Sequence, residues 1–291
     1  MTVRFHAPTK TSTFRRIAAS MWSRPNDPSI YGFIDVDVTE TLRFIDDYRA
    51  RTGDKLTITH VVSQAVARAF AQHPELNAKV RFGGRVEQRN QVDVFLSVAT
   101  AGGRDLSGVK IERADQLPLG GLLKEIANAA RRTRDGEDEV YERSRSLLGS
   151  LPWWILRPML WMTDFLTNEL HWHIPSQGMP RDPFGTAMIT NVGGFGIDTA
   201  FAPFLPMGRA PMLLLVTAVR DRPWVVDGEL AVRPVLRLCA TFDHRIVDGY
   251  QAGLLAKVIM AEVQNPSDGT QQPTTVAESA PQVALAMGMA S

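Results

Sequence analysis

The strongest candidate for chemistry in this sequence is a histidine followed four residues later by an aspartate. His244 and Asp248 lie in the run FDHRIVDG, residues 242–249, between a predicted strand and a predicted helix. Because an imidazole titrates near neutral pH, His244 can take a proton from a thiol or a hydroxyl and return it later. Asp248 can fix the turn through backbone amides or through an arginine, and Gly249 allows close approach of a ligand or a neighbouring subunit. On its own, such a pair is more often structural than catalytic.

Two other groups of residues have chemical interpretations that the sequence disfavours. His171 and His173 flank a tryptophan, but no third metal ligand is evident, so a surface or interface role is favoured and no metal site is predicted. The glycine run at residues 193–196 follows a predicted strand. Pro203 and Pro206 stand where a dinucleotide-binding fold needs a helix, so a nucleotide loop is rejected.

The composition places the chain among ordinary globular proteins. Its 291 residues are 44% hydrophobic and 22% charged, and one domain of this length can bury a large core. The formal net charge of +1 gives no electrostatic reason to expect a nucleic-acid partner. Cys239 is the only cysteine, which excludes an internal disulfide and fits a reducing compartment, here expected to be the cytoplasm. We predict that Cys239 is a small buried strand residue, and that His73 closes a helix next to Pro74.

A tryptophan-rich segment at residues 147–166 raises the question of a membrane. Pro152 and Pro158 interrupt it, and Arg157 and Asp164 lie inside it. Each such charge near a bilayer centre costs roughly 2.5–3.5 kcal/mol on insertion scales, so a spanning helix is disfavoured. An amphipathic helix on the surface of the protein or of a membrane stays open.

Hydrophobic periodicity predicts the elements that position these residues. Helices are expected at residues 12–22, after a cap at Thr39, at 59–72, at 119–130 and after Gly249. Strands are expected at residues 34–38, 92–99, 186–190, 212–219 and 235–242. Asp227-Gly228 predicts a type I′ hairpin turn. The mixture lacks strict βαβ alternation, which indicates an α+β or mixed-sheet α/β class. One domain is predicted over residues 1–265, and the polar composition of residues 266–291 predicts a disordered tail.

Several segments in the same order resemble one known family. The run at residues 238–253 resembles the signature of the dihydrolipoamide acyltransferase core of 2-oxoacid dehydrogenase complexes. Four further segments are similar to family segments: FRRIA at residues 14–18, HPELNA at 73–78, LSGVKIERAD at 106–115 and ITNVGGFG at 189–196. Ordered matches over most of residues 12–265 are far more specific than any single motif.

The resemblance implies a fold, an assembly and a reaction. The fold is the chloramphenicol acetyltransferase-like mixed-sheet sandwich with helices. Family members form trimers or higher multiples of three, with an active-site channel between subunits. The histidine comes from one chain and a hydroxyl from its neighbour, and coenzyme A and the lipoyl thiol enter from opposite ends.

Carried over by position, the resemblance also implies roles for three residues. His244 would be the general base that deprotonates the attacking thiol, and Asp248 would order the active-site turn. Thr190 stands where the family usually has a serine whose hydroxyl stabilises the tetrahedral oxyanion. A threonine hydroxyl can donate the same bond. Without the resemblance, Thr190 is a β-branched strand residue.

The sequence departs from the family in two places. The core begins close to Met1, without lipoyl and subunit-binding domains ahead of it, so we expect no bound lipoyl group in this chain. The acyl acceptor would then belong to a separate lipoyl-bearing protein or be a free small molecule. An apolar insert at about residues 143–182 is longer than expected, and it can cover the channel, line an acyl pocket, or contact another subunit or a membrane.

The predicted function is that of a coenzyme-A-dependent acyltransferase acting on a thiol such as dihydrolipoamide. Two alternatives stay open. One is a structural relative that keeps the trimer without catalysis, and the other is an O-acetyltransferase acting on a small hydroxyl compound. Coenzyme A binding separates the structural alternative from the other two.

Overall fold

The computed structural model describes residues 28–99, 106–134, 153–172, 182–204 and 208–268. Three predictions lie outside these ranges: the helix at residues 12–22, the position of His173, and the tail beyond residue 268. Ser267 and Asp268, at the start of the predicted tail, are hydrogen-bonded to the body. The Ser267 hydroxyl accepts from Arg68, and the Asp268 carbonyl accepts from the Leu119 amide.

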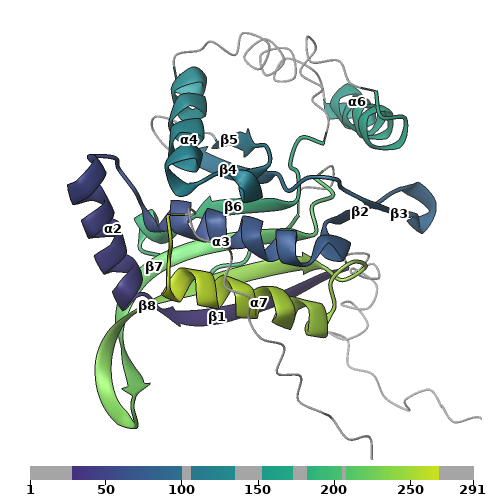
Figure 1. The fold of residues 1–291 in the computed structure, drawn as a ribbon. Helices are drawn as coiled ribbons and strands as arrows, with labels where there is room; N and C mark the ends of the chain where they lie inside the picture. The colour runs from purple at the N-terminus through teal and green to yellow at the C-terminus, as the bar shows by residue number, and fades with distance from the viewer. Residues whose placement is uncertain (1–27, 100–105, 135–152, 173–181, 205–207, 269–291) are drawn as a thin grey trace, which may run out of the picture.

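A six-stranded mixed sheet forms the centre of the molecule (Figure 1). In spatial order its strands are β1 (Ser29–Asp37), β8 (Glu229–Asp243), β7 (Met212–Val226), β6 (Ala187–Asn191), β4 (Val94–Ala99) and β5 (Leu106–Ile111). β6 is parallel to both of its neighbours, and the remaining pairs are antiparallel. The mixed sheet with helices confirms the predicted fold class.

The central strands are buried on both faces where helices and loops cover them. β7 begins with a run of buried residues from Met212 to Thr217, as expected for a strand inside a covered sheet. Beyond this run, β7 and β8 continue as a hairpin whose side chains are largely exposed. Asp227 and Gly228 have φ values of 51° and 86°, which confirms the predicted type I′ turn.

Three helices cover one face of the sheet, and their apolar sides form the main core (Figure 1). They are α3 (Ile58–Gln72), α4 (Leu119–Arg134) and α7 (Gly249–Gln264). Phe70 from α3 and Leu255 from α7 are fully buried in the same core cluster as Leu238 of the sheet. A buried ion pair between Arg68 and Glu262 joins α3 to α7.

The caps of two helices differ from one another in their chemistry. Thr39 is not the cap of α2 (Thr39–Thr52), contrary to the prediction, because Val38 takes the N-cap position. Asp37 instead accepts hydrogen bonds from the Thr39 amide and hydroxyl, at 2.9 and 2.6 Å. At α3, Thr57 and His60 form a reciprocal capping box.

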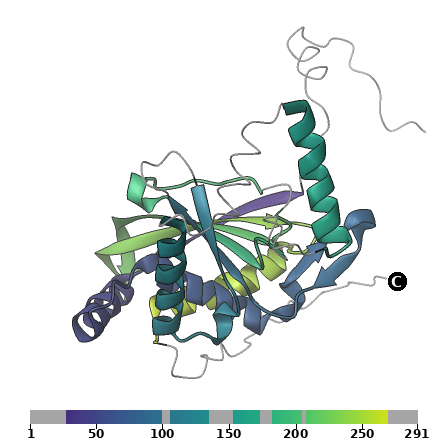
Figure 2. The same cartoon turned by 90° about the horizontal axis from the view of Figure 1, so that it is seen from above.

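A short hairpin and a helical arm lie at one corner of the molecule. The hairpin consists of β2 (Ala78–Val80) and β3 (Val86–Gln88). The arm consists of α6 (Trp153–Asp164) followed by a π-helical turn (Phe165–Glu169). Figure 2 shows α6, in teal-green, standing out from the sheet beside the hairpin. Within the described ranges, no helix is long and apolar enough to cross a bilayer.

Candidate functional site

The chain makes a tight turn immediately after β8, and this turn presents His244 to solvent. The carbonyl of Asp243 accepts hydrogen bonds from the amides of Ile246 and Val247, both at 2.9 Å. The buried Asp243 carboxylate accepts from the Arg245 backbone amide and from its guanidinium, at 2.6 to 3.0 Å. These bonds fix the backbone on both sides of His244, whose own side chain is exposed.

The imidazole of His244 is oriented by a backbone carbonyl. Its Nδ1 lies 3.2 Å from the Val247 oxygen. Because a carbonyl only accepts, this contact requires the proton on Nδ1. Nε2 then carries the free lone pair, which is the tautomer that a general base needs. Val247 itself is fully buried, so the orienting oxygen belongs to an anchored residue.

Asp248 caps the closing helix α7. Its carboxylate accepts from the amides of Tyr250 and Gln251, at 2.9 and 3.0 Å, and the Gln251 side chain accepts from the Asp248 amide at 2.7 Å. This is a complete capping box at the point where the turn becomes a helix. Of the two roles that the sequence left open, the structure shows the one through backbone amides.

Thr190 lies on the other face of the sheet from the three covering helices. In β6, Met188 packs with Leu213, Leu215 and Cys239, whereas Ile189 packs in the core beneath the helices. Side chains alternate along a strand, so Thr190 shares the face of Met188. It is half-buried near the carboxyl end of β6.

Within one chain, Thr190 and His244 are far apart. Thr190 pairs with Leu215, and Leu215 pairs with Cys239 of β8, whereas His244 lies beyond the end of that strand. Strand spacing and rise put the two side chains roughly 15–20 Å apart. A reaction that uses both residues therefore needs two chains.

The glycine turn after β6 has a structural explanation. The Asn191 side chain donates to the Thr59 hydroxyl at 2.6 Å and accepts from the Gly193 amide at 2.8 Å. A Cβ on Gly193 would lie 2.5 Å from the Thr217 carbonyl oxygen, so only glycine fits. Residues 197–204 contain no helix, as predicted. Sequence reasoning assigned no role to Asn191, although its position two residues ahead of Gly193-Gly194 was a signal for a turn.

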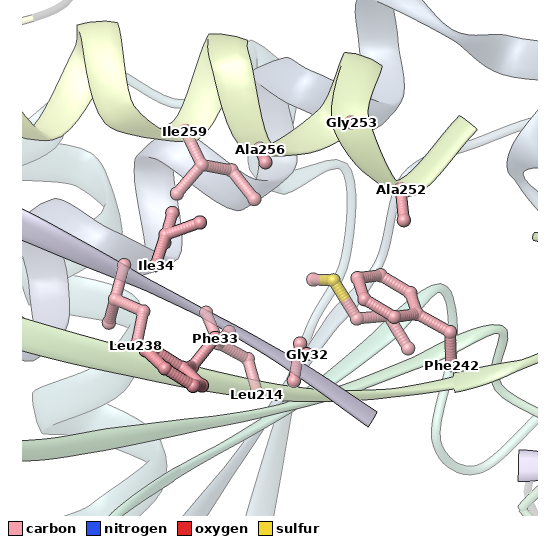
Figure 3. A pocket seen from close by; sticks show the side chains of 12 residues that line it. Gly32, Phe33, Ile34, Leu214, Leu238, Phe242, Ala252, Gly253, Ala256 and Ile259 are labelled. Atoms are coloured by element: carbon pink, nitrogen blue, oxygen red, sulfur yellow. The ribbon is translucent and has the colours of Figure 1, made fainter. Parts of the chain in front are cut away.

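An apolar cavity of about 200 Å³ lies between α7 and the sheet (Figure 3). Small side chains on both walls make room for it, including Gly32 of β1 and Ala252 and Ala256 of α7. Among the residues that the structure describes, those lining the cavity include no titratable side chain. It lies on the helix-covered face of the sheet, whereas Thr190 lies on the other face.

The remaining candidates from the sequence lie away from the His244 turn. Cys239 is fully buried, as predicted, and burial raises the pKa of its thiol. His73 ends α3, as predicted, with its amide bonded to the Ala69 carbonyl. His171 Nε2 lies 3.3 Å from a carboxylate oxygen of Glu87. Among the described residues, no hydrogen bond joins Cys239, His73 or His171 to Thr190 or to the turn after β8.

A polar network that the sequence did not assign explains one of the family-like segments. The Asn77 side chain donates to the Gln91 carbonyl and accepts from the Thr186 hydroxyl, both at 2.8 Å. The Thr186 hydroxyl also accepts from the Asp93 amide at 3.1 Å. All of these side chains except Gln91 are buried. The segment at residues 73–78 therefore connects loops around the sheet and does not reach the candidate site.

The sequence matches a family model described as 2-oxoacid dehydrogenases acyltransferase (catalytic domain), over residues 7–146 and 183–269. It is also 28% identical over 240 residues to the dihydrolipoyllysine-residue succinyltransferase component of the 2-oxoglutarate dehydrogenase complex of Bartonella vinsonii subsp. berkhoffii. That alignment covers 80% of this chain and 47% of the relative. The chain thus spans about half the length of this relative.

Two solved structures have a similar fold. One is the cubic core of the pyruvate dehydrogenase multienzyme complex, with a TM-score of 0.61 and 21% identity. The other is the dihydrolipoamide acetyltransferase of Azotobacter vinelandii, with a TM-score of 0.61 and 20% identity. Each alignment covers 90% of this chain and 92% of the solved one.

Proposed function

Since this chain belongs to the family of 2-oxoacid dehydrogenase acyltransferase catalytic domains, we propose that it moves an acyl group between coenzyme A and a thiol such as that of dihydrolipoamide. The observation that carries this proposal is the orientation of the exposed His244. Its Nδ1 donates to the Val247 carbonyl, and its Nε2 is available to accept a proton from a bound thiol.

The proposed reaction uses His244 twice. Nε2 removes the proton of the attacking thiol, and the thiolate forms a bond to the thioester carbonyl carbon. The tetrahedral intermediate then expels the second thiolate, which recovers the proton from the imidazolium. Charge on the carbonyl oxygen is stabilised by the Thr190 hydroxyl of a neighbouring chain, a contribution worth about 10²–10³ in rate at comparable sites.

One similar structure supports an equivalent set of residues. In the Azotobacter acetyltransferase, a serine, a histidine and an asparagine have been investigated for their role in the catalytic mechanism, and the asparagine follows the histidine by four residues. His244 and Asp248 have the same spacing. In our proposal Thr190 takes the part of the serine, and Asp248 keeps the turn in place through the cap of α7.

The distance between Thr190 and His244 leads us to propose a homotrimer, or a higher multiple of three, with each site shared by two chains. A cubic core among the similar structures supports an assembly of this kind. We propose a separate lipoyl-bearing protein as the natural thiol partner, with coenzyme A as the other acyl carrier. The single cysteine is unpaired, which fits the reducing conditions of the cytoplasm.

Acetyl transfer from acetyl-coenzyme A to free dihydrolipoamide tests the proposal. The native protein should catalyse it, and His244→Ala should abolish it. His171→Ala removes an imidazole outside the turn and should keep native activity. Full activity in His244→Ala would show that another group is the base. Coenzyme A binding without transfer would point to a different acceptor, and absence of both would favour a structural role.

A further inference from the structure

The helical arm has its polar side turned inward and its apolar side turned to solvent. Trp161, Met162 and Phe165 follow one another at helical spacing, and all three are exposed, Trp161 to 68%. Asp164 and Glu169 face the body of the protein instead. A helix on the surface of a monomer in water normally has the opposite orientation, so its outward face is suited to an apolar environment.

Two arginines from the body hold the arm in this orientation. Arg209 pairs with Asp164 at 2.7 Å and with Glu169, and Arg81 pairs with Glu169 at 3.2 Å. The Phe82 amide donates to the Glu169 carboxylate at 2.8 Å. Burial alone would raise the pKa of Glu169, but the bonds from Arg209 and Phe82 bring it below its usual range. Both carboxylates of the arm are thus paired with arginine and withdrawn from its outer face.

The neighbouring hairpin extends the exposed apolar surface. The bond between Phe82 and Glu169 places the hairpin tip beside the end of the arm, and the Phe82 ring is 79% exposed. Figure 2 shows the two elements side by side. The aromatic ridge, as this surface is called below, consists of Phe82, Trp161, Met162, Phe165, Leu170 and Trp172, all exposed.

The charges around the aromatic ridge leave it with a cationic edge. Glu87 of the hairpin is surrounded by Lys79, Arg81 and His171, at 3.3 to 3.5 Å. Arg85 at the hairpin tip is exposed. Among the charged groups described at this corner, the carboxylates are therefore paired, and Arg85 adds a positive charge beside the apolar side chains.

We propose that the aromatic ridge lies on the surface of an anionic phospholipid bilayer, with its apolar side chains at the acyl boundary and Arg85 among the phosphates. Tryptophan prefers this interface, and a helix lying in it needs an apolar face and a cationic border. A second copy meeting the same patch would offer Arg85 only the same positive charge. The arm falls within residues 147–182, which the family match skips, so the arm is additional to the shared domain, whereas Phe82 and Arg85 lie within the matched residues. The proposal does not depend on acyl transfer.

Flotation with vesicles tests this proposal. The native protein should float with phosphatidylcholine vesicles that contain phosphatidylglycerol. Combined Trp161→Ser and Phe165→Ser should lower the bound fraction at least about tenfold. Arg85→Ala should lower binding to these vesicles about fivefold and leave binding to pure phosphatidylcholine unchanged. The matched control is Val225→Ser with Leu230→Ser, which removes an exposed apolar pair from the β7–β8 hairpin and should float as the native protein does.

Two results would overturn the proposal. One is a native protein that stays with the unbound fraction. The other is a Trp161→Ser, Phe165→Ser variant that floats as well as the native protein while its circular dichroism is unchanged. If native protein fails to float and only the ridge variant dissociates into smaller species in mass photometry, the ridge contacts a second copy instead of lipid.

Discussion

Replacing Asp248 by alanine and by asparagine separates the capping role of this residue from a role of its negative charge. The carboxylate accepts two backbone amides of α7. Alanine leaves both without an acceptor, and loss of an N-cap costs about 1 kcal/mol, within a range of roughly 0.5–2. Asparagine caps helices about as well as aspartate, so Asp248→Asn should remain within a few tenths of a kcal/mol of the native stability. In a domain of this size, 1 kcal/mol shifts Tm by about 2–4 °C.

The same pair of variants should differ in catalysis. Val247, whose carbonyl orients the His244 ring, directly precedes the capping residue. Loosening the cap in Asp248→Ala lets this carbonyl move, and a misplacement of about 1 Å can cost about 10²-fold in rate. We therefore expect kcat to fall about 10- to 100-fold in Asp248→Ala, with a smaller change in KM for coenzyme A. Asp248→Asn should be close to native in both constants.

Urea denaturation and steady-state acetyl transfer on the three proteins provide the test. If Asp248→Asn has native stability but loses as much activity as Asp248→Ala, capping does not explain the requirement. The negative charge would then be needed, as in an ion pair with an arginine, which is the other role that the sequence left open.

Three further predictions concern stability and reactivity. Burial lowers the pKa of His60, so the unfolded state binds the proton more readily, and stability should decrease as pH falls below about 6.5. His60→Gln keeps the capping box with Thr57, so between about pH 8 and 5 it should lose less stability than the native protein in urea denaturation. Equal losses of stability in the two proteins would refute this prediction. Gly253→Ala adds a methyl group to α7 in open space, so the free energy of unfolding should rise by about 0.5–1 kcal/mol, measured as a higher urea midpoint. A lower midpoint would contradict this prediction. Cys239 should react with a thiol reagent only after denaturation, and rapid labelling of the native protein would show that β8 opens.

Local patterns in the sequence predicted the central elements of this fold well. The apolar runs at residues 212–219 and 235–242 lie in β7 and β8, and Asp227-Gly228 forms the predicted turn. The strands extend further than predicted because the outer half of the hairpin is held by strand pairing rather than by burial. β2 and β3 were missed because each has three residues, too few for an alternating pattern.

The geometry of the site depends on contacts that a local pattern does not contain. His244 and Asp248 were identified by their spacing, but the orientation of the ring comes from the Val247 carbonyl, a backbone atom. The separation of Thr190 from His244 follows from the order of β6, β7 and β8 in the sheet, which long-range pairing decides. The inverted orientation of α6 depends on Arg209, which lies far away in the sequence.

Acetyl transfer by mixed oligomers tests the shared site most directly. His244→Ala and Thr190→Val should each be nearly inactive alone. When equal amounts of the two chains are assembled together, about a quarter of the sites should combine an intact His244 with an intact Thr190 from the neighbouring chain, so about a quarter of the native activity should return. Mixed trimers, verified by native mass spectrometry with differently tagged chains, that show no activity above that of the separate variants would contradict a site shared between two chains.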